Sequence, residues 1–199
     1  MKRIIAPLFL CSLIFIACNN NKSKENTTSI DTAGKQPVTI TTNEVKEATQ
    51  DMQQLKEELT KMTPLSADEL KTRVPDELMG VTTTNVDVNA AMGASVANAD
   101  YKINDSAKLK LEIVDCAGPG GAGIFDLQYL GMLNVNTDDE NEYVKTIDFN
   151  GGKAFENCKK NRNHCIFAYF SGNRFLVSLT GDNVGIDALK DVAKGLEIK

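Results

Sequence analysis

The hydrophobic and polar positions of residues 43–62 repeat with the period of an α-helix. Apolar side chains recur every three or four residues, at Val45, Ala48, Met52, Leu55, Leu59 and Met62. This spacing places them on one stripe of a helix that Asn43 would cap and Pro64 would end. The stripe fits either a coiled coil with a second copy or packing against the chain's own domain. Its length of fewer than three heptads favours packing against the domain.

Other patterns follow along the chain. Ser66 and Glu69 form a capping box, which predicts a short second helix that ends before Pro75. Alternating apolar and polar residues then predict strands at 95–103 and 109–113, joined by a turn at 104–106. Further strands are expected at 143–149 and 153–158, with a turn at 150–152 between them.

The clearest pattern is a hairpin of residues 165–170 and 175–180. A turn at Gly172 and Asn173 would place Phe170 opposite Phe175. Since residues 165–170 are apolar on both faces, we expect helices to cover both faces. A last helix at 184–196 would be capped by Asp182 or Asn183. The predicted fold is α+β: a mostly antiparallel sheet flanked by helices in three layers, after an N-terminal amphipathic helix.

The N-terminal residues are expected to be an export signal. Two basic residues precede an apolar run, residues 4–17, that is too short to span a bilayer. Ala17 precedes Cys18, as in a bacterial lipobox, and Cys11 is a weaker rival because the large Leu10 precedes it. We predict a signal peptide at 1–17, lipidation of Cys18, a disordered polar tether at 18–43, and a single domain at 44–199. The alternative is an ordinary cleaved signal peptide with an incidental cysteine.

Composition narrows the class of partner. The chain of 199 residues has 27 acidic and 22 basic residues, a net charge of −5. This balance disfavours nucleic acid as a partner. Together with the expected export signal and Cys18, this predicts a domain that a palmitate-type lipid anchors to the bacterial cell membrane or outer membrane, outside the cytoplasm.

Several small motifs resemble a known family. They are Pro75–Gly80, then Gly93–Ser95 leading a strand of small residues to Tyr101, then Leu111–Asp115 and Gly152–Ala154. Last comes Arg174–Val177, followed by Gly181 and a helix. Their order resembles uncharacterised bacterial envelope lipoproteins, and it implies an architecture similar to the PsbP-like α/β/α sandwich over residues 44–199. The resemblance implies an accessory or assembly role and supplies no catalytic residues.

A glycine-rich segment is the candidate binding loop. Residues 118–123 satisfy G-x-G-x-x-G, but a dinucleotide site needs a parallel βαβ unit, and Pro119 removes one phosphate-binding N–H. We therefore expect no cofactor here. The prediction is a flexible loop beside a ligand groove, formed by Gly118, Gly120, Gly121, Gly123 and Tyr101.

Cysteines and the single histidine complete the candidate chemistry. Cys158 and Cys165 flank a predicted turn, which suits a disulfide, although Cys116 could instead pair with one of them or stay free. We interpret His164 as an exposed turn residue, and no nucleophile and base set can be read from the sequence. The acidic loop 134–142 departs from an EF-hand at its sixth and twelfth positions. We expect no metal and no catalytic residue.

The functional prediction is a membrane-anchored, non-enzymatic lipoprotein that binds an envelope protein partner or assists assembly. The candidate surface consists of the glycine loop 118–123, the acidic loop 134–142 and the hairpin tip 159–164. The alternative is a domain that binds a small ligand near the glycine loop and Tyr101.

Overall fold

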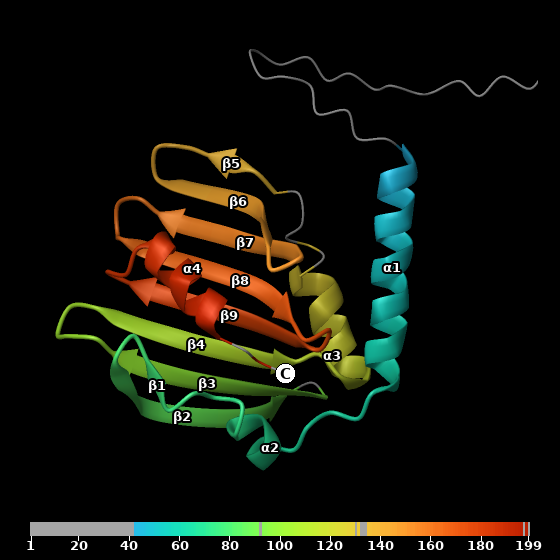
Figure 1. Ribbon diagram of the computed structural model, residues 1–199, viewed down its shortest axis with the longest axis horizontal. Helices are drawn as coiled ribbons and strands as arrows, with labels where there is room; N and C mark the ends of the chain where they lie inside the picture. The colour runs from blue at the N-terminus through green and yellow to red at the C-terminus, as the bar shows by residue number, and fades with distance from the viewer. Residues whose placement is uncertain (1–41, 92, 130, 132–134, 197, 199) are drawn as a thin grey trace, which may run out of the picture. The chain divides into compact units, whose positions relative to one another are not determined.

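Nine strands form one antiparallel sheet in the computed structural model, which describes residues 42–91, 93–129, 131, 135–196 and 198 (Figure 1). The strand order is β1-β2-β3-β4-β9-β8-β7-β6-β5, so β9 joins the N-terminal and C-terminal halves of the sheet. The side chains of residues 42–50 and 91 are not described. The predicted signal peptide, Cys18 and most of the predicted tether lie outside the described residues.

The elements have the following bounds. The helices are α1 (Thr42–Lys61), α2 (Ala67–Lys71), α3 (Gly118–Ile124), the π-helix η1 (Phe125–Tyr129) and α4 (Ile186–Gly195). The strands are β1 (Glu77–Leu78), β2 (Val81–Ala91), β3 (Ala94–Lys102), β4 (Lys108–Asp115), β5 (Thr137–Asp138), β6 (Glu142–Phe149), β7 (Gly152–Lys159), β8 (His164–Ser171) and β9 (Phe175–Asp182).

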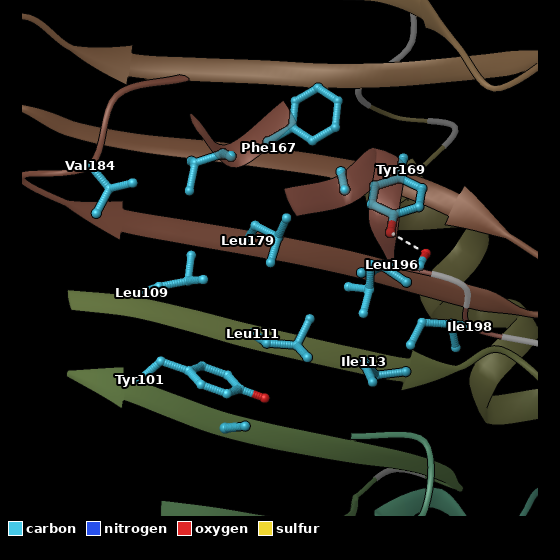
Figure 2. Packing of buried hydrophobic residues seen from close by; sticks show 14 of the residues in the cluster. Tyr101, Leu109, Leu111, Ile113, Phe167, Tyr169, Leu179, Val184, Leu196 and Ile198 are labelled. Atoms are coloured by element: carbon cyan, nitrogen blue, oxygen red, sulfur yellow. Dashed lines mark hydrogen bonds between the residues drawn. The ribbon is translucent and has the colours of Figure 1, made fainter. Parts of the chain in front are cut away.

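The main hydrophobic core lies on one face of the sheet. Alternate residues of β3, β4, β8 and β9 point to this face, as strand periodicity requires. Leu189 and Ala193 of α4 and Leu70 of α2 join them there. Figure 2 shows the labelled members together: Tyr101, Leu109, Leu111, Ile113, Phe167, Tyr169, Leu179, Val184, Leu196 and Ile198.

A smaller cluster lies on the second face, at the end of the sheet where α1 and α3 lie (Figure 1). Leu59 of α1 is fully buried there with Phe125, and Met52 and Leu55 are half-buried beside them. The rings of Phe170 and Phe125 are tilted against each other, with their centroids 4.7 Å apart. This packing confirms the predicted helix against its own domain, but the helix spans Thr42–Lys61, so Asn43 lies within it and Met62 follows its end.

The predicted three-layer, helix-flanked sandwich is wrong, because the helices are too few and too short to cover the sheet. Nine strands at about 4.8 Å each make a sheet about 40 Å wide. The ten residues of α4 extend only about 15 Å, and α1 packs mainly on α3. Ile166, on the second face of β8, accordingly stays half-exposed. The described chain is dominated by one broad antiparallel sheet.

The predicted pairing within the β8–β9 hairpin is also wrong by one residue. Gly172 and Asn173 form the predicted turn, both with positive φ. Ser171 however pairs with Phe175, so the turn contains a third residue, Arg174. Phe175 therefore enters the main core, because a shift of one residue moves a side chain to the opposite face.

Candidate functional site

The antiparallel order brings several connections to the end of the sheet that lies opposite α1 and α3 (Figure 1). We call three of them the loop end: the β3–β4 turn (103–107), the β7–β8 turn (160–163) and the β9–α4 connection (183–185). Asn183 joins all three. Its side-chain Nδ2 donates to the carbonyl of Ser106 (2.6 Å), and its backbone N–H donates to the carbonyl of Asn163 (2.8 Å).

A row of charged side chains crosses the second face at the loop end. Register places His164, Asp182, Lys108 and Lys102 side by side on four adjacent strands. His164 Nδ1 lies 2.6 Å from Asp182 Oδ1, and Lys108 Nζ lies 3.1 Å from Asp182 Oδ2. The hydrogen bond with His164, followed by that with Lys108, lowers the pKa of Asp182 below its ordinary value.

Beside this row lies a polar hollow of about 500 Å³. The register of β2 against β3 shifts between Thr83 and Asn85, next to Asp100, and Thr84 at this irregularity lines the hollow. Asn104 keeps the turn rigid because its Oδ1 accepts hydrogen bonds from two backbone N–H groups, those of Ser106 and Ala107. The polar side chains around the hollow come from Thr84, Asp100, Lys102, Asn104, Asp105, Ser106 and Lys108.

The predicted glycine loop is a helix, α3, at the opposite end of the sheet. Glycine is a poor helix former, but here its small size permits close packing. A Cβ atom on Gly121 would lie 2.6 Å from the carbonyl oxygen of Asp115, and one on Gly118 would lie 2.8 Å from Pro64 Cγ. Gly120 and Gly123 belong to the same helix. We predicted a flexible loop because the sequence does not show this close approach.

The structure does not bring Tyr101 and the glycine segment together. Tyr101 is fully buried in the main core, and its hydroxyl donates to the carbonyl of Pro75 (2.6 Å). Burial raises the pKa of Tyr101 to about 12. The glycine helix packs with the smaller cluster on the second face. Tyr101 instead borders the polar hollow at the loop end.

The predicted disulfide is confirmed. Cys158 and Cys165 face each other across β7 and β8, with an S–S distance of 2.09 Å and a Cα–Cα distance of 4.1 Å. Cys116 is free and buried, and burial raises the pKa of its thiol to about 12. Its nucleophilic thiolate form is therefore scarce at neutral pH.

Two of the three predicted surface loops touch each other. Lys160 Nζ of the hairpin tip lies 2.6 Å from Asp138 Oδ1 of the acidic loop and 2.5 Å from the carbonyl of Asp139. Within the described residues, no three His, Cys, Asp or Glu side chains are grouped so that they could hold a metal ion.

Sequence reasoning missed the partners of His164. We expected an exposed turn residue, but His164 begins β8 and its side chain is only 26% exposed. We also expected Asp182 or Asn183 to cap the last helix, whereas Gly185 occupies the N-cap position without a side-chain cap. The pairing of β8 with β9 could have suggested the His164–Asp182 contact, had the extra residue in the hairpin been predicted.

Comparisons with known proteins identify no relative: no family model, curated protein or solved structure matches the chain. The resemblance to envelope lipoproteins therefore stays a prediction. None of the helices in the described part of the chain is both long and apolar enough to cross a membrane.

Proposed function

We propose that the chain is a lipid-anchored protein of the bacterial cell envelope whose domain binds a protein partner without catalysing a reaction. The apolar run that ends at Ala17 and Cys18, followed by a polar segment, supports the anchor. The ordered loops at the loop end support the binding role, since binding residues are often carried by loops on a rigid scaffold.

The observation that carries this proposal is the placement of the loop end. The described chain begins with α1, which packs on α3 at one end of the sheet, and the loop end lies at the other (Figure 1). Strands β4, β8 and β9, of eight residues each, separate the two ends by about 26 Å. The loop end therefore lies at the end of the sheet away from α1, and we propose that the partner binds there.

Mutation of the anchor cysteine tests the first half of the proposal. The Cys18→Ser variant should lose lipid labelling and leave the membrane fraction, because no thiol remains to be acylated. Cys11→Ser is the matched control, and it should be labelled and membrane-bound like the chain of unaltered sequence. A Cys18→Ser protein that stays labelled and membrane-bound would contradict the anchor.

Photo-cross-linking in cells tests the second half. A cross-linking residue in place of Arg162, at the loop end, should capture one recurring envelope protein. The same residue in place of Lys61, at the end of α1, should not capture it. Equal capture from both positions would contradict a partner site at the loop end.

Small-ligand binding is a second candidate function, which the polar hollow favours. Its volume of about 500 Å³ falls within the range of ligand pockets. A ligand that binds only the folded state would raise the melting temperature of the domain.

A further inference from the structure

Two lysines face each other at the mouth of the hollow without an evident structural benefit. Lys102 of β3 and Lys108 of β4 are directly opposed in register and share the second face of the sheet. Opposed side chains in such pairs have Cβ atoms about 5 Å apart, and like charges there reduce stability. Each ammonium group instead pairs with an acid, Lys102 with one in the β3–β4 turn and Lys108 with one on β9. Lys102 Nζ is 2.8 Å from Asp105 Oδ1, and Lys108 Nζ is 3.1 Å from Asp182 Oδ2.

These ion pairs leave both lysines available to a ligand. The side chains of Lys102 and Lys108 are 60% and 69% exposed, and exposed ion pairs are worth about 1 kcal/mol or less. An anionic group placed between the two ammonium groups would relieve their repulsion and accept a charge-assisted hydrogen bond from each.

A carboxylate of opposite charge lies beside the lysine pair. Asp100 precedes Lys102 by two residues on β3, so both side chains lie on the same face. Asp100 borders the hollow and forms no ion pair within 4.0 Å among the described residues, even with its cross-strand neighbour Lys110. The spacing of about 7 Å between alternate residues of a strand leaves room for a short ligand between Asp100 and the lysines.

We propose that the hollow binds a small zwitterion, such as a dipeptide with free ends. The lysine pair would hold its carboxylate, Asp100 would hold its ammonium group, and Asn104 Nδ2 would donate to its polar atoms, since Asn104 Oδ1 already accepts from the Ser106 hydroxyl. The charge of Asp100 disfavours dianions such as phosphate. This inference rests on the second candidate function and does not depend on the lipid anchor, so the Cys18→Ser test stays separate from it.

Calorimetric titration of the full chain in detergent tests the inference with three probes. Alanyl-alanine carries both charges, its N-acetyl form lacks the ammonium group, and its C-terminal amide lacks the carboxylate. We expect saturable binding of alanyl-alanine and roughly tenfold weaker binding of both blocked forms, since each loses one charged hydrogen-bonded contact.

Variants identify the residues responsible. Lys102→Gln should weaken alanyl-alanine binding roughly tenfold while leaving the fold intact, and Asp100→Asn should do the same. Lys153→Gln is the matched control, because Lys153 is also an exposed lysine paired with one aspartate, Asp148. The proposal is overturned if none of the probes binds saturably, if the amide binds as tightly as the free acid, or if Lys102→Gln binds like Lys153→Gln.

Discussion

At the scale of single residues, two aspartates hold the seam between β4 and β9, one at each end. Asp115 is fully buried and accepts two hydrogen bonds from Arg174. Arg174 Nε donates to Oδ1 at 2.8 Å, and Nη2 donates to Oδ2 at 2.9 Å. The backbone N–H groups of Leu65 and Ala117 also donate to this carboxylate. Burial alone would raise the pKa of Asp115, but the hydrogen bonds from Arg174 and the two N–H groups lower it by more.

Removal of Arg174 should show how much this contact contributes to the free energy of unfolding. Arg174→Met leaves the Asp115 carboxylate buried without its counter-ion, which should reduce the free energy of unfolding by about 3–5 kcal/mol. Urea denaturation at pH 7 measures the loss. Lys153→Met, which removes the exposed partner of Asp148, should change it by less than about 1 kcal/mol. Equal effects of the two variants would contradict a structural role for Arg174.

The second aspartate predicts a dependence of stability on pH. The pKa of Asp182 is lower in the folded chain than in the unfolded chain, first through its bond with His164. Its contribution is therefore present above the ordinary aspartate pKa of about 3.9, and is lost as pH falls through the folded value. Asp182→Asn should flatten this part of the profile. Urea denaturation between pH 3 and pH 7 measures the change, and an unchanged profile would rule this contribution out.

At the scale of elements, α3 shows how packing overrides propensity. Its sequence, GPGGAGI, is among the poorest for a helix, yet the close approach to the end of β4 requires small residues. Strand β2 is another element that we did not predict. Its sequence is rich in threonine and asparagine, and only three half-buried valines, Val81, Val86 and Val88, pack against the main core.

Two glycines of α3 provide a matched pair of substitutions. Gly121→Ala should destabilise the domain by several kcal/mol, because the new Cβ would lie 2.5 Å from the carbonyl carbon of Cys116. Gly123→Ala meets no atom within 4 Å, so it should stabilise the helix by up to about 1 kcal/mol. Thermal denaturation of both variants measures the difference. The opposite order of melting temperatures would show that α3 does not pack in this way.

At the scale of the whole molecule, stability should be highest at the centre of the sheet. Strands β4 and β9 are hydrogen-bonded on both sides and contribute to both hydrophobic clusters. Strand β5 has only two residues, both exposed, at the edge. Since local opening is hardest where burial is greatest, amide hydrogen exchange should be slowest in β4 and β9 and fastest in β5 and the adjacent part of β6. Comparable rates in β5 and β9 would contradict this distribution.

Local pattern determined which segments form most of the helices and strands. The helix of residues 42–61, the capping box at Ser66 and Glu69, and the disulfide pair Cys158–Cys165 all depend on residues close together in the chain. Periodicity and capping act over one or two turns, so a single sequence reveals them.

Tertiary structure alone decided the features that depend on distant segments. Arg174 becomes an extra residue of the hairpin beside Asp115, 59 positions earlier, and the register of β8 and β9 follows from that. Strand pairing likewise brings Lys102 opposite Lys108 and His164 opposite Asp182. Whether the helices are enough to cover a nine-stranded sheet is also decided only when the strands are assembled. These outcomes depend on which surfaces meet in space, and the local pattern of the sequence does not encode that.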